Sequence, residues 1–157
     1  MSQIKSLAYQ TGRSVEETRR YNRTPMDTLE LIEGHGIQGD IKAGKHRRRQ
    51  LNVMSREVLN HLAELGYHTA PGEMGEQLVL EGVDFSSLKA GMQLQLGDDA
   101  IIELTMKRVG CAWLEMVQGR PAIKETKAKL GFMAKVIKSG KIQVDDPVKI
   151  LIHEQTN

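Results

Sequence analysis

The sequence predicts a mainly β protein, a barrel or sandwich of about seven or more short strands with a few peripheral helices. Apolar and polar residues alternate in many short segments, which is the pattern of strands that turn one face to a core. Turns that contain glycine separate many of these segments, as expected for short consecutive strands. The 157 residues suffice for one domain with its own core, so we expect a single domain over residues 1–157.

The alternation is clear where Ile102, Leu104 and Met106 occupy every second position between polar neighbours. Such a segment buries one face of a strand and exposes the other. By the same criterion we expect strands at residues 29–31, 51–53, 78–80, 92–96, 102–106, 132–136, 142–144 and 148–152.

Two helices interrupt this pattern. Ser55 is placed to cap a helix that runs to Leu65, because the apolar residues between them recur at helical spacing and Gly66 follows. Ser14 and Glu17 form a capping box, which predicts a short polar helix near residues 15–21.

The segment 112–130 has no single interpretation from sequence. Trp113 and Met116 have helical spacing, but Gly119 and Pro121 would end a helix there.

Composition excludes several classes of partner. The net charge of +2, from 22 basic and 20 acidic residues, gives no general attraction to nucleic acids or membranes. The chain has no apolar run of the roughly 18 residues that span a bilayer, and its N-terminus lacks a signal-peptide pattern. A single cysteine suits a reducing compartment. We therefore expect a cytoplasmic protein with no nucleic-acid or membrane partner.

That cysteine, Cys111, follows a predicted strand and cannot form an internal disulfide. Its functional roles would be to bind a soft metal, attack a substrate or carry a sulfur atom. Arg108, three residues earlier, could favour the thiolate that all three roles need. The alternative is that Cys111 only fills space in the core, as free cysteines often do.

The densest charge in the sequence lies directly before the strand that begins at Leu51. It suits the capture of a phosphate or another small anion, although a solvated basic loop is an equal alternative. Nucleic acid is a weaker interpretation, since no aromatic residues accompany the charges for base stacking. The charged run comprises Lys42, Lys45, His46, Arg47, Arg48 and Arg49.

Two glycine-rich turns carry the carboxylates Asp40 and Glu76. We expect both to bind backbone N–H groups and hold the turns, rather than to act in catalysis. The sequence has no Ser-His-Asp order, Walker sequence or dinucleotide fingerprint, and its histidines lack zinc-ligand spacing.

Several of these features, in their order along the chain, resemble the MOSC domain. This is the C-terminal domain type of molybdenum cofactor sulfurases, and it also occurs in small bacterial proteins and amidoxime-reducing enzymes. The resemblance covers about residues 25–152. Its motifs are residues 36–40, residues 49–51, Ser55 with Glu57, residues 71–78, Gly91, Arg108, Cys111, and Asp146 with Val148.

The resemblance implies a barrel-like β fold that binds the molybdenum cofactor (molybdopterin). It implies that Cys111 is the sulfur ligand to molybdenum or a sulfur carrier, and that Arg49 and Arg108 bind the cofactor. Arg47 and Arg48 are candidate cofactor-binding residues on the charge argument alone.

This chain departs from the family pattern at three positions. Lys42 stands where a histidine is common, Gln77 replaces the usual asparagine, and Asp145 replaces a glycine. The first change weakens any claim for an ancillary acid or base at that position. We expect no sulfurase activity that starts from free cysteine, because the chain lacks the pyridoxal-phosphate-dependent domain of larger members.

Two functions stay open on sequence. One is an enzyme that reduces N-hydroxylated or N-oxide substrates at a cysteine-ligated molybdenum, with electrons from a separate donor protein. The other is a non-catalytic carrier that delivers the cofactor, or a cysteine persulfide, to an apo-enzyme. Both would use Cys111 and the same anion site, so the sequence does not separate them.

Overall fold

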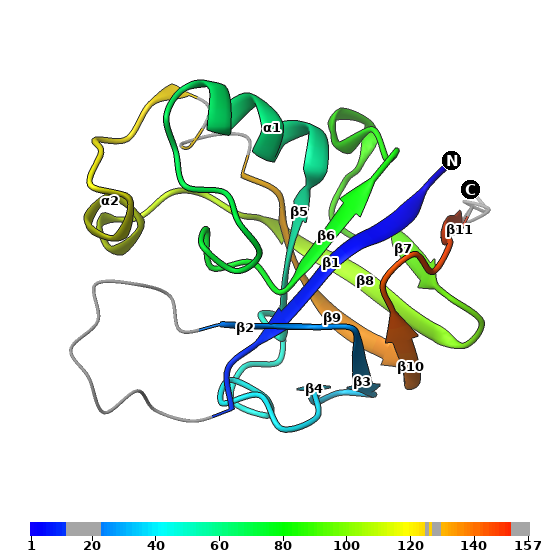
Figure 1. Cartoon of the computed structure of the whole chain (residues 1–157). Coiled ribbons are helices and arrows are strands. Elements are labelled where there is room, and N and C mark those ends of the chain that lie inside the picture. Colours follow the sequence, from blue (N-terminus) through cyan, green and yellow to red (C-terminus); the bar gives the residue numbers. More distant parts are fainter. Residues whose placement is uncertain (12–22, 125, 127–129, 152–157) are drawn as a thin grey trace.

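The computed structural model describes residues 1–11, 23–124, 126 and 130–151. Within them the protein is mainly β, with one eight-stranded sheet, one three-stranded sheet and two α-helices (Figure 1). The helix expected near residues 15–21 lies outside the described residues. No described helix has both the length and the apolar character needed to cross a lipid bilayer.

The eight-stranded sheet has the order β11-β7-β8-β9-β5-β6-β1-β2. All neighbours are antiparallel except β5 and β6, which the helix α1 (Arg56–Glu64) connects as a crossover. The strands are β1 Gln3–Tyr9, β2 Thr24–Met26, β5 Leu51–Ser55, β6 Leu78–Glu81, β7 Gln93–Leu96, β8 Ala100–Lys107, β9 Phe132–Lys138 and β11 Val148–Leu151.

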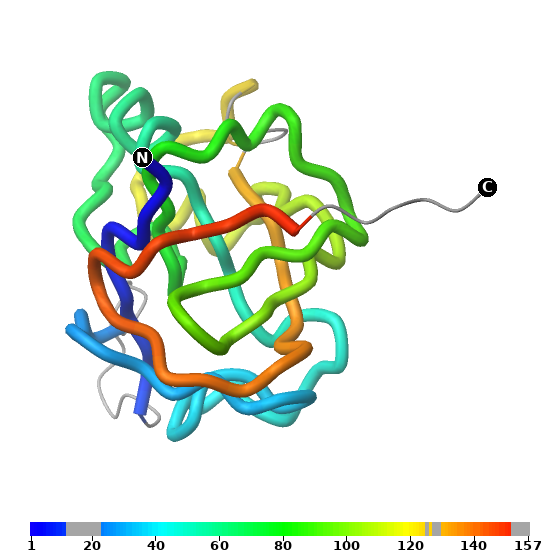
Figure 2. The backbone as a smooth tube through the Cα atoms, turned by 90° about the vertical axis from the view of Figure 1, so that its right-hand side faces the viewer, coloured from blue at the N-terminus to red at the C-terminus, as the bar shows by residue number. Residues whose placement is uncertain are grey.

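The smaller sheet has the order β10-β3-β4, from Gly140–Gln143, Thr28–Ile32 and Gly36–Ile37. Its apolar residues Leu29, Leu31 and Ile142 join the same buried cluster as those of the larger sheet. The tube in Figure 2 shows the two sheets curving around this common interior.

A second apolar cluster lies on the outer face of the larger sheet. Strand β5 contributes to both clusters, because successive side chains point to opposite faces: Val53 faces the main core and Met54 the outer cluster. Helices α1 and α2 (Ala112–Gln118) supply Leu59, Leu62 and Leu114 to the outer cluster. The two helices therefore cover one face of the sheet.

The helix signals in the sequence are confirmed where the structure describes them. The Ser55 hydroxyl accepts a hydrogen bond of 3.2 Å from the Val58 amide, which caps α1 as expected. In the ambiguous segment, α2 forms and ends at Gly119, whose left-handed backbone (φ 66°) terminates the helix.

The mainly β prediction is confirmed, but closure into a barrel is not. An isolated bridge between Gln3 and Pro147 joins the first and last strands without forming a ladder. Backbone bonds flank this bridge, from the Ile4 N–H to the Asp146 carbonyl (2.9 Å) and from the Val148 N–H to the Ser2 carbonyl (3.0 Å), and Asp145 beside it has a positive φ of 74°. The contact between β1 and the start of β11 stays limited to this bridge, so the ladders run from β11 to β2 without closing.

Gly131 allows β9 to begin close against β5. It has a φ of +127°, and a Cβ atom there would collide with the Val53 carbonyl. Gly119 also has a positive φ but has open space around its Cβ position. Substituting alanine at Gly119 therefore tests backbone strain alone, whereas alanine at Gly131 tests backbone strain and steric collision together.

We predict that Gly131→Ala destabilises the protein by about 3 kcal/mol, because left-handed strain and displacement of β5 add together. Gly119→Ala, which carries strain alone, should cost about 1 kcal/mol. Urea denaturation of both variants measures the difference. Equal losses would show that β9 can move away from β5 without penalty.

Candidate functional site

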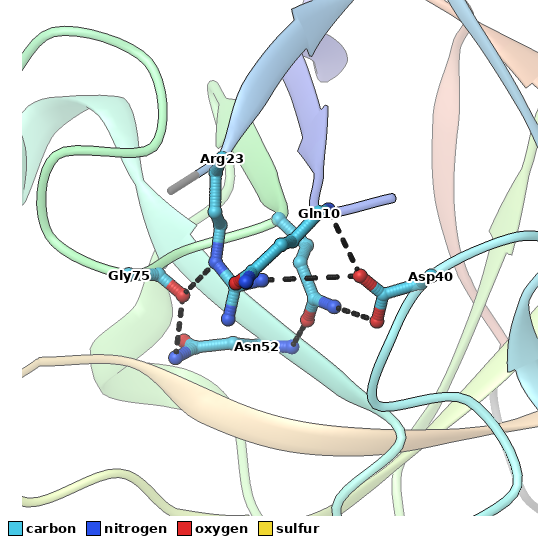
Figure 3. A network of polar contacts seen from close by, with 6 residues as sticks. Gln10, Arg23, Asp40, Asn52 and Gly75 are labelled. Carbon is cyan, nitrogen blue, oxygen red and sulfur yellow. Dashed lines mark hydrogen bonds and ion pairs between the residues drawn. The ribbon is translucent and has the colours of Figure 1, made fainter. Parts of the chain in front are cut away.

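A buried polar network joins the loop after β4 to the parallel pair β5–β6 (Figure 3). Asp40 accepts hydrogen bonds from the Gln10 backbone N–H (3.0 Å) and from the Gln77 side-chain amide (2.9 Å). Gln77 in turn accepts from the Asn52 backbone N–H (2.8 Å). These bonds fix three distant segments against one another, and Asp40 has the structural role that the sequence suggested.

Gly75 is the second meeting point of this network. Its carbonyl accepts bonds from the Asn52 side chain (3.2 Å) and from Nε of Arg23 (2.8 Å). The Arg23 guanidinium also lies 4.0 Å from Asp40, and both side chains are buried. A positive charge is therefore held beneath the surface next to the loop after β4.

Glu76 holds the turn that contains Gly75. Its carboxylate accepts 3.0 Å bonds from the Gly72 and Met74 amides, so it too is structural, as predicted. Burial raises the pKa of this carboxyl, against the opposing effect of the backbone N–H groups.

Arg108 adds a second buried cation at the end of β8. Only 9% of the residue is exposed, and its guanidinium donates to the side-chain oxygen Oδ1 of Asn52 (3.2 Å), the Met54 sulfur (3.4 Å) and the Met74 backbone carbonyl. Arg108 is thus built into the same network as Arg23, at a fixed position.

Cys111 lies three residues beyond Arg108, at the N-cap of α2, and its thiol is exposed. Gly110 holds this turn through a 2.8 Å bond from its N–H to the Thr126 carbonyl. A Cβ atom at Gly110 would lie 2.7 Å from that carbonyl, so only glycine fits. The cavity on the inner side of Cys111 measures about 10 Å³, room for about one water molecule. Because Cys111 is exposed, a ligand can reach its thiol directly from solvent.

Lys42 interacts electrostatically with both buried cations and with Cys111. Its charge interacts with those of Arg23, Asp40, Arg108 and Cys111, so these groups lie within electrostatic range of its ammonium. Much of Lys42 is exposed, yet partial desolvation and then repulsion from Arg23 lower the pKa of its ammonium. Asp40 lies beside Arg23 and within electrostatic range of Lys42, while Glu76 interacts with Arg108. Three cations thus share two carboxyl groups that are already hydrogen-bonded, and the remaining positive charge favours an anion beside Cys111.

The sequence placed Lys42 in the basic run that suits anion capture and noted it as a departure from a family histidine, but it did not link Lys42 to Cys111. Lys42 and Cys111 are far apart in sequence, and no local pattern brings them together. The available signals were a cation two residues after Asp40 and its place at the start of the basic run.

The arginines of the basic run occupy a different part of the surface. Arg47 and Arg48 line a groove of about 530 Å³ together with Gln50 and Lys135, and neither Cys111 nor Arg108 lines it. Arg48 also donates a 3.2 Å bond to the Thr105 carbonyl of β8. Arg49 is exposed and makes no hydrogen bond or ion pair with another described residue. The structure therefore groups Arg108 with Cys111, and Arg47 with Arg48.

The order of these motifs along the chain identifies the family. The family model of the MOSC domain matches residues 38–149, more than half of the chain, and includes Asp40, Lys42, Arg108 and Cys111. The chain belongs to the MOSC domain family. No curated protein matches this MOSC chain at a significant level.

Solved structures share the MOSC fold of this chain. YuaD from Bacillus subtilis is 20% identical, with a TM-score of 0.77 and 98% of each chain covered. YiiM from Geobacillus stearothermophilus is 18% identical, with a TM-score of 0.75 over 99% of this chain and 78% of YiiM. YiiM from Escherichia coli is 23% identical, with a TM-score of 0.68 over 96% and 70%. These likenesses concern the fold.

We predict that Lys42→Gln stabilises the ligand-free protein at neutral pH by about 0.5 kcal/mol, because it removes the partial desolvation of the ammonium and its repulsion from Arg23 and Arg108. The unfolded chain binds more protons than the folded protein between the lowered pKa of Lys42 and its ordinary value. Wild-type stability therefore rises with pH through that window, and the advantage of the variant should vanish above it. Urea denaturation across this pH range measures the effect.

Lys45→Gln is the matched control, an exposed lysine of the same loop. A gain in both variants, or a Lys42→Gln gain that does not change with pH, would contradict the repulsion argument.

Proposed function

We propose that this MOSC protein binds the molybdenum cofactor, with Cys111 as the sulfur ligand to molybdenum. The observation that carries the proposal is the exposed thiol beside the excess positive charge of Lys42, Arg23 and Arg108. A thiolate is a suitable soft ligand for the metal, and the anionic groups of the cofactor need cations.

Each residue has a distinct part in the proposed site. Arg23 and Arg108 are held by the buried network, so they supply positive charge without reorganising when an anion arrives. Lys42 is exposed and regains its ordinary proton affinity when an anion neutralises its surroundings. The basic run would hold the phosphate end of the cofactor, since Arg49 has no other partner among the described residues and Arg47 and Arg48 line the groove.

The leading activity is reduction of N-hydroxylated or N-oxide substrates. When bound, the cofactor supplies the two-electron transfer that cleaves the N–O bond. The overall reaction adds two electrons and two protons to R₂N–OH and gives R₂NH and water. The exposed ammonium of Lys42 supplies one of these two protons, and solvent supplies the other.

The electrons must come from a separate protein in this proposal. Three apolar side chains around Cys111 are exposed, namely Val109 at 63%, Trp113 at 45% and Met116 at 44%. This surface suits contact with the electron donor.

The second candidate is a carrier that passes the cofactor, or a persulfide on Cys111, to an apo-enzyme. The observation in its favour is that Cys111 is exposed and that the cavity beside it, among the described residues, has room for only about one water molecule. The same apolar surface would then contact the receiving enzyme.

We predict that Cys111→Ser loses bound molybdenum but folds normally, because serine is nearly isosteric but is a hard oxygen ligand. Protein purified from a host that makes the cofactor should be analysed for metal content and unfolding temperature. Met116→Leu removes an exposed sulfur from the same helix and should keep its molybdenum. Equal molybdenum in Cys111→Ser and wild type would disprove the ligand assignment.

For the activity, we predict turnover of an amidoxime or N-hydroxylated base by molybdenum-loaded protein with a reduced viologen as donor. Cys111→Ala should abolish turnover, and rates should be measured across pH for wild type and Lys42→Gln, whose profile should lose the fall in rate at high pH that deprotonation of Lys42 causes in the wild type. Loaded protein that reduces no member of a broad N-oxygenated panel, yet reconstitutes an apo-enzyme, would establish the carrier instead.

A further inference from the structure

A cavity of about 760 Å³ opens at the end of the sheet where β5, β6 and β8 finish and β9 begins. Its size is within the range of small-molecule sites. It shares no lining residue with the cavity beside Cys111 or with the arginine groove. Its wall consists of Ser55, Glu57, Val58, Gly82, Val83, Asp84, Phe85, Ser86, Leu88, Lys107, Gly131 and Phe132.

The floor of this cavity is apolar and partly aromatic. Val83, Leu88 and Phe132 belong to the buried main core, and Phe85 packs against it while partly exposed. The rings of Phe85 and Phe132 lie 6.2 Å apart at 50°. Two tilted rings offer both a face and an edge to a third ring, which is a favourable aromatic arrangement.

Lys107 is the available charge in the wall. The residue is exposed, and its ammonium makes no hydrogen bond or ion pair with any other residue that the structure describes. Because successive strand residues point to opposite faces, Lys107 turns to this cavity while Arg108 turns to the buried network.

The two carboxylates of the wall, Glu57 and Asp84, already accept hydrogen bonds from neighbouring groups. Glu57 accepts bonds from the Gly82 amide (2.7 Å) and the Ser55 hydroxyl (3.0 Å) at the start of α1. Asp84 accepts bonds from the amide (3.0 Å) and hydroxyl (2.6 Å) of Ser86. Lys107 is thus the charged group in the wall without such partners.

We propose that this cavity binds a small aromatic carboxylate, with its ring against Phe85 and Phe132 and its carboxylate on Lys107. The site is separate from the cofactor site, and its occupation requires no molybdenum. A charge-assisted bond to Lys107 should raise affinity about tenfold over a neutral ligand of the same shape.

The test is an NMR titration of the full chain with three probes of one shape and different charge: 2-naphthoate, 2-naphthylmethanol and 2-naphthylmethylamine. Octanoate, an aliphatic carboxylate, is the fourth probe. We expect 2-naphthoate to bind most tightly, about tenfold above the alcohol, with amide shifts at Val83, Phe85 and Phe132. Lys107→Gln should remove the tenfold advantage and leave the alcohol unchanged.

Lys138→Gln is the matched control, since Lys138 is an exposed lysine of β9 that does not line the cavity. It should leave all four affinities unchanged. Tighter binding of the amine would overturn the charge assignment, as would an unchanged naphthoate affinity in Lys107→Gln. Octanoate binding as tightly as naphthoate would overturn the aromatic class, and shifts elsewhere, or none with any probe, would overturn the site.

Discussion

The candidate cofactor site depends on the hydrogen bonds of one buried residue, Asn52 on β5. Its side chain accepts from Arg108 and donates to the Gly75 carbonyl, while its backbone N–H binds the Gln77 side chain. The Gln77 side chain also donates a hydrogen bond to Asp40. Asn52 therefore links the turn at Gly75, the turn at Asp40 and the end of β8, which leads to Cys111. Without Asn52, the Arg108 charge and the Gly75 carbonyl would each lose a buried partner, which is more costly than losing an exposed contact.

This network has an electrostatic consequence for the surface above it. Arg23 and Arg108 stay charged beneath Lys42, and that charge opposes a further proton there. A fold selected for stability alone would gain by removing one of the three cations. Positive charge retained beside an exposed thiol is the pattern of a site that sacrifices some stability for anion binding.

The strands were largely predictable, because their alternation is local. Strand β1 was missed because a bulge between Ile4 and Ser6 breaks its period of two, and β4 has only two residues. Cys111 and Arg108 were identifiable because they are neighbours in sequence. The link between Lys42 and Cys111 was not, because it depends on the long-range pairing of the strands. Charge density pointed to Arg47 and Arg48, but it carries no information on the groove that they line.

The alternation that predicts the strands also explains how one β-strand end serves two sites. At the end of β8, Lys107 and Arg108 are adjacent cations, yet one lines an open cavity and the other is nine-tenths buried. The Arg108 N–H donates to the Gly131 carbonyl (2.9 Å), which fixes the strand and therefore the direction of both side chains. Gly131 can approach β5 this closely only because glycine has no Cβ atom. A one-residue shift in this pairing would exchange the two cations, placing the flexible lysine in the network and the arginine fork in the cavity.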